Sequence, residues 1–320
     1  MGEFMRIENL KVHYPIRSGF FNRVTDHVYA VDDVSMVFEE GKTYGLVGES
    51  GSGKSTIGKS IVGLERITSG TIYYEGEDIS KSIRNRRSDY RRNVQMIFQD
   101  SLSSFNPKRR ITDVLGEPIR NFESLTPEEE TRRKIELLEI VGLTEEALLK
   151  YPHEFSGGQR QRIGVARAVA INPKLIIADE PVSALDLSVQ AQVLNFMKRI
   201  QEEFKISYLF ISHDLGVVKH MCDELAIMYR GRFTEYGTRS DIYGNPQHIY
   251  TRRLLSAIPQ IDTENRDEHK LNRLRVEKEY QQNASQYYDE KGRVYDLKAI
   301  SSTHHVGLKS VENLEKGSVI

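Results

Sequence analysis

The chain has 320 residues and a formal net charge of −1, and it contains one cysteine, Cys222. This length is enough for one large domain with an appendage, and near-neutral charge gives no sign of a general nucleic-acid binder. The single cysteine excludes an internal disulfide and a metal site made of several cysteines, and no apolar run reaches the roughly 20 residues that a membrane-spanning helix needs.

The first predicted elements are two strands followed by a glycine-rich turn. Residues 5–13 and 28–38 alternate apolar and polar side chains, as half-buried strands do. The segment between them, residues 14–27, contains Pro, Gly, Ser and Asn and is predicted to be a loop. An apolar strand over residues 43–47 leads into the turn, and a helix is predicted over residues 56–62. Strand, glycine-rich turn and helix form the context in which phosphate-binding loops occur.

The turn carries the motif GxxxxGK[ST], as the sequence GESGSGKS. Backbone N–H groups of such a loop and the positive end of the following helix are suited to a polyphosphate. Its lysine, Lys54, would reach the β- and γ-phosphates of ATP, and its serine, Ser55, would supply a hydroxyl to Mg²⁺. An ordinary flexible turn is the weaker interpretation, because a strand precedes the motif and a helix follows it. The predicted nucleotide-binding residues are Gly48, Glu49, Ser50, Gly51, Ser52, Gly53, Lys54, Ser55 and Thr56.

Further strands are predicted in the middle of the chain. Short strands are expected over residues 71–74 and 94–98. Residues 175–178 and 208–211 are wholly apolar, which is typical of parallel strands that are buried on both faces. The helix predicted over residues 189–204 would supply the crossover between these two strands.

A further helix is marked by its own start and stop signals. Thr126 is an N-cap, Pro127 stands at the first helical position, and a glutamate follows three residues after the cap. The helix is predicted to run to about Val141 and to be stopped by Gly142.

Two acidic residues follow the strand predicted over residues 175–178. The strand would deliver Asp179 to the surroundings of the metal ion, and Glu180 could polarise a water for in-line attack on the γ-phosphate. An acidic strand end is common by itself. Beside a phosphate-binding loop, the catalytic interpretation is favoured.

A second candidate anion site is the tetrapeptide made of Ser156, Gly157, Gly158 and Gln159. It is a capping box for a helix predicted over residues 158–170, and a helix N-terminus attracts anions. One ATP cannot reach both this tetrapeptide and the phosphate-binding loop within a subunit of this size. We therefore infer that the tetrapeptide contacts the γ-phosphate of ATP held by another subunit. A capping box alone would indicate only a helix start.

Together these motifs resemble those of ATP-binding cassette (ABC) proteins, over residues 5–260. Gln99 in MIFQD matches the family's Q-loop glutamine, Asp186 in SALD ends its D-loop, and His213 in FISHD is its switch histidine. The resemblance implies an α/β fold, namely a P-loop NTPase (RecA-like) nucleotide-binding domain. It would have an N-terminal antiparallel β portion, a helical signature subdomain around residues 99–168 and a C-terminal extension.

The resemblance also implies roles for these residues. Gln99 would touch Mg²⁺ or the attacking water and would couple to a membrane partner. His213 would contact the γ-phosphate and orient Glu180, and Asp186 would act across a dimer interface. The residues implied at the metal are Ser55, Gln99 and Asp179.

An aromatic residue that stacks on adenine is expected near the N-terminus. Tyr14 is the candidate by its place at the end of the first strand. Tyr29 and His27 compete for the role, and a simple packing aromatic is the alternative reading of Tyr14.

Three stretches are similar to the oligopeptide/dipeptide importer branch of the family, namely residues 101–107, 151–168 and 245–259. The last is the most specific, because generic cassettes lack it. In that branch one of two paired ATPases carries a Cys-rich iron–sulfur tail. No cysteine follows Cys222, so the chain resembles the other partner, the OppF/DppF type. Nickel importers share these features, so nickel import is kept as an alternative function.

The implied function is that of an ATPase at the cytoplasmic face of a cell membrane, with ATP and Mg²⁺ as cofactors. ATP-driven closure of a dimer would energise uptake of oligopeptides or dipeptides. The implied partners are a second ATPase, identical or related, two transmembrane permease subunits and, indirectly, an extracytoplasmic solute-binding protein; no nucleic acid is expected. The rival is an ABC ATPase that serves no transporter. It is disfavoured because residues 105–153 are too short for a long coiled coil and the chain holds one cassette.

The composition changes after Pro259. Residues 261–320 are rich in Glu, Lys, Arg, Asn and Gln without a periodic apolar stripe, so an accessory extension that contacts neither phosphate site is expected. Residues 245–259 carry apolar side chains at helical spacing, and this helix should dock on the cassette or on the paired ATPase. A chain ending near Ile261 is expected to keep ATP binding, and one ending near Gly244 to be unstable or to assemble poorly.

Overall fold

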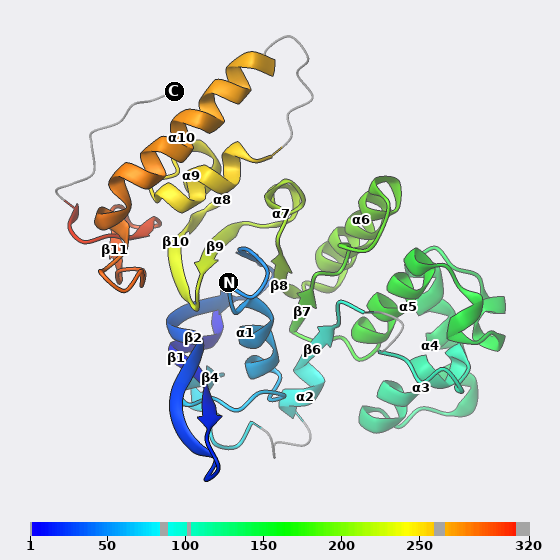
Figure 1. Cartoon of the computed structure of the whole chain (residues 1–320). Helices are drawn as coiled ribbons and strands as arrows, with labels where there is room; N and C mark the ends of the chain where they lie inside the picture. Colours follow the sequence, from blue (N-terminus) through cyan, green and yellow to red (C-terminus); the bar gives the residue numbers. More distant parts are fainter. Residues whose placement is uncertain (1, 84–88, 101–103, 259–265, 312–320) are drawn as a thin grey trace.

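The computed structural model describes residues 2–83, 89–100, 104–258 and 266–311. Two β-sheets form its centre (Figure 1): a four-stranded sheet in the order β2-β1-β4-β5 and an eight-stranded sheet in the order β11-β12-β10-β9-β3-β8-β7-β6. This is the α/β arrangement with an antiparallel N-terminal portion that the sequence predicts.

One long hairpin dominates the four-stranded sheet. β1 (Glu3–Ser18) pairs antiparallel with β2 (Arg23–Glu39) on one side and with β4 (Ser69–Tyr74) on the other. The two-residue strand β5 (Glu77–Asp78) pairs with β4. The sheet therefore confirms the strands predicted at both ends of the hairpin and the strand that follows α1.

The loop predicted over residues 14–27 is wrong. These residues continue the hairpin, with Pro15 opposite His27, and only the turn at residues 19–22 lies outside the strands. Pairing of β1 with β4 reaches no further than Lys11. Beyond that point β1 has a free edge, where a proline removes no ladder hydrogen bond. The proline was therefore compatible with a strand, and the turn signal belonged to the residues after it.

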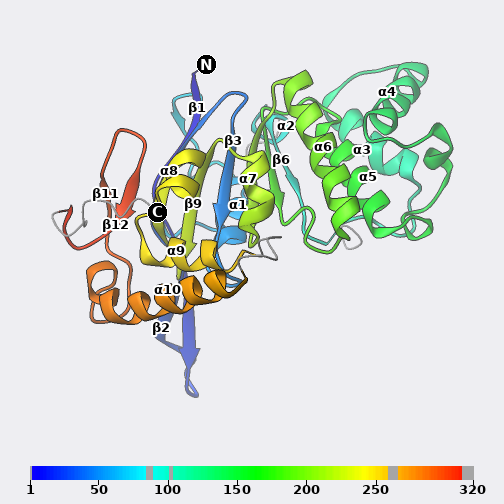
Figure 2. The ribbon, with the colours of Figure 1, turned by 90° about the horizontal axis from the view of Figure 1, so that it is seen from above.

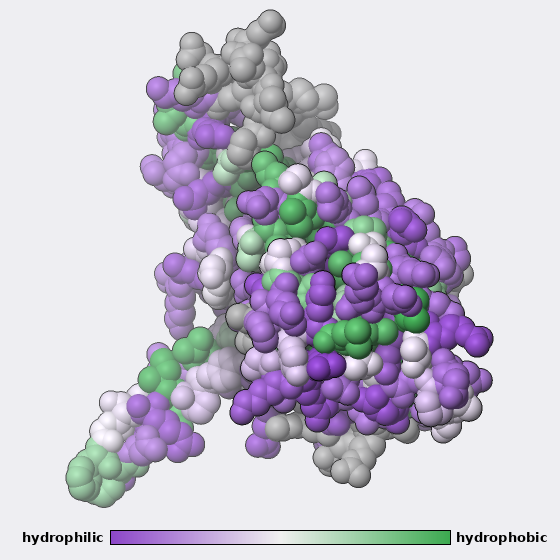
Figure 3. All heavy atoms as spheres, turned by 90° about the vertical axis from the view of Figure 1, so that its right-hand side faces the viewer, coloured by the Kyte–Doolittle hydropathy of each residue, from purple (hydrophilic) through white to green (hydrophobic). Residues whose placement is uncertain are grey.

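The end of the hairpin stands away from the body of the molecule (Figure 3). Phe20 and Phe21 at its turn are 98% and 77% exposed, and Ile16 and Val24 beside them are also exposed. The tip is thus apolar and uncovered in the single chain.

The centre of the eight-stranded sheet is parallel. It consists of β6 (Val94–Ile97), β7 (Leu175–Asp179), β8 (Ser207–Ser212), β3 (Thr43–Val47) and β9 (Glu224–Tyr229). Every residue of β3, β7 and β8 is buried, as in strands covered on both faces. The predicted buried strands are confirmed, and their carboxyl ends lie at one edge of the sheet.

Several helices pack around this sheet. They are α1 (Lys54–Ile61), α2 (Asp89–Asn93), α6 (Leu187–Phe204), α7 (Leu215–Met221) and α8 (Arg239–Gly244). α6 lies between β7 and β8 in the chain and is the predicted crossover.

A separate group of helices lies to one side of the sheet (Figures 1 and 2). It contains α3 (Ile111–Phe122), α4 (Pro127–Ile140) and α5 (Gly157–Val169). α4 begins at the predicted capping box, in which the Thr126 hydroxyl accepts from the N–H of Glu129 at 3.3 Å. Gly142, with a φ of 69°, follows its end. Both predicted signals are confirmed.

The C-terminal part of the chain joins the central sheet. β10 (Arg232–Thr238) pairs with β9, β12 (His305–Gly307) pairs with β10, and β11 (Leu297–Ala299) pairs with β12. α9 (Ile249–Ser256) and α10 (Arg266–Tyr287) pack against each other beside these strands (Figure 2). The boundary expected near residue 260 lies outside the described residues. None of the described helices, α10 included, is both long and apolar enough to cross a membrane.

Candidate nucleotide-binding site

The glycine-rich loop between β3 and α1 is packed against two other strands. A Cβ atom on Gly53 would lie 1.9 Å from the carbonyl oxygen of Ala30 in β2, and one on Gly48 would lie 2.1 Å from that of Met228 in β9. Gly53 also has a φ of 107°, a conformation that favours glycine. Close backbone approach therefore explains both glycines, and it sets the shape of the loop.

The side chain of Lys54 lies inside the loop. Its Nζ donates to the carbonyl oxygens of Gly48 and Glu49, both at 2.8 Å, and to Ser52 Oγ at 3.3 Å. Burial lowers the pKa of this ammonium, while neighbouring carboxylates, Glu180 foremost, raise it. A cation ringed by backbone groups is the arrangement that cradles the β- and γ-phosphates in loops of this type.

The residues implied at the metal lie beside the loop. Ser55 Oγ donates to Asp179 Oδ1 at 2.7 Å, and Asp179 is buried at the end of β7. Burial raises the pKa of this carboxyl, and the bond from Ser55 lowers it. A hydroxyl and a carboxylate are oxygen donors that Mg²⁺ takes alongside phosphate oxygens and water, and Gln99, which carries an amide oxygen, lines the same cavity as Ser55. The donor set therefore fits Mg²⁺.

Three residues from separate segments meet at the end of β7. Glu180 Oε2 accepts from Gln99 Nε2 at 2.9 Å and lies 3.3 Å from Nδ1 of His213. Glu180 has a φ of 46°, which is uncommon for a residue with a side chain. Such strain is concentrated at functional sites. The structure thus brings together the three predicted catalytic residues, Glu180, His213 and Gln99.

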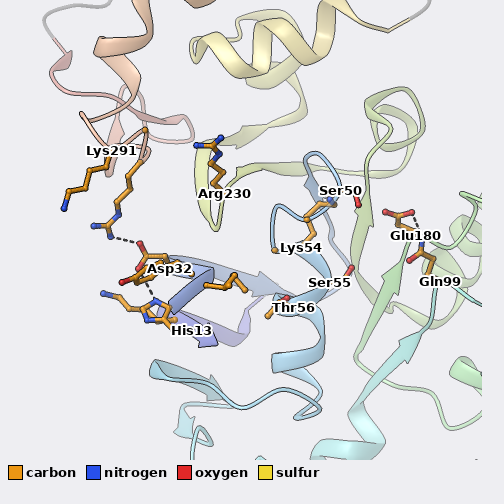
Figure 4. A pocket seen from close by; sticks show the side chains of 18 residues that line it. His13, Asp32, Ser50, Lys54, Ser55, Thr56, Gln99, Glu180, Arg230 and Lys291 are labelled. Carbon is orange, nitrogen blue, oxygen red and sulfur yellow. Dashed lines mark hydrogen bonds and ion pairs between the residues drawn. The ribbon is translucent and has the colours of Figure 1, made fainter. Parts of the chain in front are cut away.

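A cavity of about 930 Å³ runs from these residues to the hairpin (Figure 4). Its catalytic end is lined by Lys54, Ser55, Gln99 and Glu180, and its hairpin end by Lys11, His13, Tyr29 and Asp32. The volume is in the range of small-molecule and cofactor sites. The cavity therefore joins the phosphate-binding loop to a part of the molecule that the sequence motifs do not describe.

The second candidate anion site lies away from this cavity. Ser156 caps α5 as predicted: its hydroxyl accepts from the N–H of Gln159 at 3.3 Å, and the side chain of Gln159 accepts from the N–H of Ser156 at 2.9 Å. Ser156 and Asp186 are exposed, and neither lines the cavity. Gly158 packs closely on α6, since a Cβ there would lie 2.4 Å from Val189. Gly157, between Ser156 and Gly158, is the first residue of α5. Ser156 and Asp186 thus lie on the surface of the single chain, whereas Gly158 is buried.

The aromatic residue for adenine stays a prediction. Tyr14 does not line the cavity, although its phenol interacts with Thr56 at the end of the phosphate-binding loop and with Glu65. Burial is the main cause of the raised pKa of this phenol. Tyr29 lines the cavity, and its ring meets the ring of His13 edge-on at 4.6 Å. Tyr29, the competing candidate from the sequence, is thus the tyrosine that lines the cavity.

Sequence reasoning missed an ion-pair group at the hairpin end. The buried carboxylate of Asp32 lies 2.6 Å from Nη2 of Arg293, 3.3 Å from Nη1 of Arg232 and 3.5 Å from Nε2 of His13. These residues come from β1, β2, β10 and the segment after α10. No short motif contains them, so only the tertiary fold could have identified the group.

The stretch 245–259 also reaches the phosphate-binding loop. The Tyr250 hydroxyl accepts from the N–H of Glu49 at 3.3 Å, and the ring of Tyr250 is buried against Tyr229. α9 therefore docks on the cassette, as its apolar spacing predicts, and it supports the loop directly.

Comparisons with known proteins agree with this geometry. The sequence pattern of the family "ABC transporter" matches residues 31–183, and that of "Oligopeptide/dipeptide transporter, C-terminal region" matches residues 234–291. The oligopeptide transport ATP-binding protein OppF of Lactococcus lactis is 60% identical over 316 residues, which cover 98% of this chain and 99% of that protein. The dipeptide transport ATP-binding protein DppF of Escherichia coli is 46% identical, covering 81% of this chain and 78% of the relative.

The solved structures that match include ABC cassettes. One, described as a dimeric post-hydrolysis state of the ATP-binding cassette MJ0796 bound to ADP and Pi, has a TM-score of 0.65 and 26% identity, covering 73% of this chain and 98% of that chain. The chain therefore belongs to the ABC transporter family, as an ATP-binding protein of its oligopeptide/dipeptide branch.

Proposed function

We propose that this chain is the ATP-hydrolysing subunit of an importer for oligopeptides or dipeptides. The observation that carries the proposal is the contact of Gln99, Glu180 and His213 beside the phosphate-binding loop. The peptide substrate is supported by the names of the relatives, which include oligopeptide and dipeptide transport proteins. Nickel or another solute of the same branch is the alternative cargo.

The chemistry assigned to the site is hydrolysis of ATP. Lys54 would hold the β- and γ-phosphates, and Ser55, Asp179 and Gln99 would hold Mg²⁺, which neutralises charge that develops on the phosphate oxygens. Glu180 would accept a proton from the attacking water. His213 would keep Glu180 oriented through the contact between their side chains.

Completion of the site is assigned to a second ATPase subunit, identical or related. Ser156, Gly157, Gly158, Gln159 and Asp186 lie outside the cavity of their own chain, and Ser156 and Asp186 are exposed. A partner chain could therefore place its own copy of these residues on the γ-phosphate. Because ATP would then bind the closed pair better than the open pair, closure would be driven by binding and reversed by hydrolysis.

The remaining partners follow from the branch to which the chain belongs. We assign the chain to the cytoplasmic face of the cell membrane, held there by two transmembrane permease subunits. An extracytoplasmic solute-binding protein would deliver the peptide to these permeases. The described part of the chain contains no helix fit to cross a membrane, so attachment through other subunits is consistent with the structure.

The test is peptide uptake in cells. A strain that lacks this chain should regain uptake of labelled di- and oligopeptides with the wild-type chain and not with Glu180→Gln. The permease subunits should co-purify with both forms. Failure of any permease to co-purify, with ATPase activity intact, would favour the rival ATPase that serves no transporter. Uptake of Ni²⁺ in place of peptides would move the cargo to the alternative.

A further inference from the structure

One wall at the hairpin end of the cavity comes from the far end of the chain. Lys291, Gly292 and Arg293 line the cavity, together with Arg230 from the turn between β9 and β10. Figure 4 shows Lys291 on the same side of the cavity as Asp32, on the opposite side from Glu180. Residues 289–293 are named here the C-terminal turn.

The C-terminal turn is held in one shape by its own hydrogen bonds. Asp289 Oδ1 accepts from the N–H groups of Lys291 and Arg293, at 2.9 and 2.8 Å. On either side of the turn, Tyr288 and Val294 are buried and form a β-bridge with each other. The backbone that carries Lys291 is therefore anchored in the apolar core of the C-terminal region.

The turn is also tied to the hairpin. Arg293 lies 2.6 Å from Asp32 Oδ2, and Arg232 lies 3.3 Å from the same oxygen. Asp32 is 7% exposed, whereas the side chain of Arg293 is 52% exposed, so the contact joins a buried carboxylate to a guanidinium that water still reaches. Two arginines already neutralise the Asp32 carboxylate.

Lys291 is left with a positive charge that the protein does not use. Its side chain is exposed on the cavity wall, and its ammonium has no hydrogen bond or ion pair with any of the described residues. Arg230 beside it is near Gly292 and stacks on the ring of Tyr229. The protein thus holds a free cation at the rim of a cavity that would receive a polyanion.

We propose that Lys291 is a nucleotide-binding residue, and that the Arg293–Asp32 ion pair positions it. With the adenine at the hairpin end and the β- and γ-phosphates at Lys54, Lys291 would attract the negative charge of ATP from its α-phosphate side. The inference rests on the proposed function, in that the cavity is taken as the ATP site. It makes the region after α10 a part of that site, where the sequence alone predicts an extension that contacts neither phosphate site.

The experiment measures the Kd of ATP with Mg²⁺ on the full chain by titration calorimetry. The variants are Lys291→Ala, Lys291→Arg and the matched control Lys278→Ala, an exposed lysine of α10 that does not line the cavity. Lys291→Ala should raise the Kd about fivefold at low salt, the size of a half-exposed ion pair. Lys291→Arg should restore binding, and Lys278→Ala should leave it unchanged. The fivefold effect should shrink as salt screens the charge.

Two further variants test positioning and separate the hypotheses. If Arg293 acts by holding Lys291 in place, then Arg293→Ala together with Lys291→Ala should weaken binding no more than Lys291→Ala alone. An additive loss would overturn the positioning role. A Kd for Lys291→Ala equal to that for Lys278→Ala would overturn the proposal for Lys291. Lys54→Ala is measured in the same series: if it leaves the Kd unchanged, the cavity is not the ATP site and the proposed function itself fails.

Discussion

The catalytic end and the hairpin end of the cavity differ in how the chain assembles them. At the catalytic end, Lys54, Ser55 and Glu180 belong to short motifs that each stand where a buried strand ends. At the hairpin end, Asp32 and Lys291 come from opposite ends of the sequence and meet through sheet pairing and ion pairs. A residue of the first kind can be recognised from its neighbours in the chain. A residue of the second kind can be recognised only from its neighbours in space.

The largest effect is expected at the catalytic end. Glu180→Gln should bind ATP normally and lose hydrolysis by about 10² to 10⁴, because an amide cannot act as a general base. Lys54→Ala should lose both binding and hydrolysis. The measurements are the steady-state ATPase rate and the Kd of ATP, with size-exclusion chromatography to detect a trapped closed dimer. Glu203→Gln, an exposed residue of α6, is the matched control. Near-normal turnover of Glu180→Gln would place the base elsewhere.

Removal of the C-terminal region is the next largest change. A chain ending after Ile258 would lose His304, whose Nε2 lies 2.7 Å from the fully buried Glu235 carboxylate. Removing a hydrogen-bond partner of a buried group costs about 1 to 3 kcal/mol. The truncation would also remove the buried residues that pack against Ile249, namely Tyr287, Tyr288, Val294, Val306 and Leu308. The structure therefore predicts an unstable protein, against the expectation from sequence that such a chain keeps ATP binding.

Urea unfolding and ATP titration of this truncated chain decide between the two expectations. A chain ending after Val311 retains every described contact and serves as the control. Equal stability and equal affinity in both chains would mean that the hairpin end of the cavity does not depend on the C-terminal region.

A pH effect is expected from His248, which is fully buried at the start of α9. Burial lowers the pKa of His248 to about 3, with the Arg252 charge adding to the effect, and its Nδ1 accepts from the N–H of Tyr250. Its ring also packs against the rings of Tyr287 and Tyr288, and the backbone N–H of His248 donates to Glu235. Between pH 6.5 and 3 the unfolded chain binds a proton at this residue and the folded chain does not. As the pH is lowered through that window, the free energy of unfolding should therefore decrease, by up to about 1.4 kcal/mol per pH unit.

The check is thermal unfolding across pH 7 to 4 for the wild-type chain and His248→Asn. Asparagine can accept the same N–H as a helix cap and does not titrate. The variant should show a shallower loss of stability on acidification. An equally steep loss in both proteins would assign the acid sensitivity to other groups.

A smaller effect than these is expected for the aromatic residue that stacks on adenine. Tyr14→Ala should raise the Kd of ATP about tenfold if its ring stacks on the base, since such stacking is worth about 1 to 3 kcal/mol. Tyr14→Phe should bind as the wild type does. Tyr29→Ala is the competing variant, because Tyr29 lines the cavity and Tyr14 does not. A larger loss with Tyr29→Ala than with Tyr14→Ala would transfer the role to Tyr29.

Much of the fold could be predicted because its signals are local. The strands β3, β7 and β8 are short apolar runs, and the starts of α4 and α5 are capping boxes that need only four residues to be recognised. Glu180 was also predictable from the residues, since it follows such a strand, whereas Gln99 and His213 were identified from the family resemblance. The contact of His213 with Glu180 was expected from family resemblance and is present in the structure, whereas the hydrogen bond from Gln99 to Glu180 was not predicted.

The predictions that were wrong concern residues whose structure depends on neighbours far away in the sequence. Pro15 suggested a loop, but it lies where β1 has no second neighbour, and a hairpin is compatible with it. The segment after α10 lacks an apolar stripe in the sequence because its buried residues are spread over a helix end, a turn and two three-residue strands. Val294 and Val306, for example, are buried in the same cluster while lying in different elements. Distance in the sequence concealed their common core.

The pairing of β12 with β10 also has a consequence for how this protein is made. β10 is complete by Thr238, but its outer edge stays open until His305–Gly307 has left the ribosome, because β12 is the strand that covers it. An open strand edge is a site at which another chain can pair. Nascent and prematurely terminated chains therefore expose such an edge in addition to the buried carboxylate of Glu235. Quality control of this protein should accordingly recognise chains cut within the last part of the described sequence as aggregation-prone, although their catalytic motifs are all present.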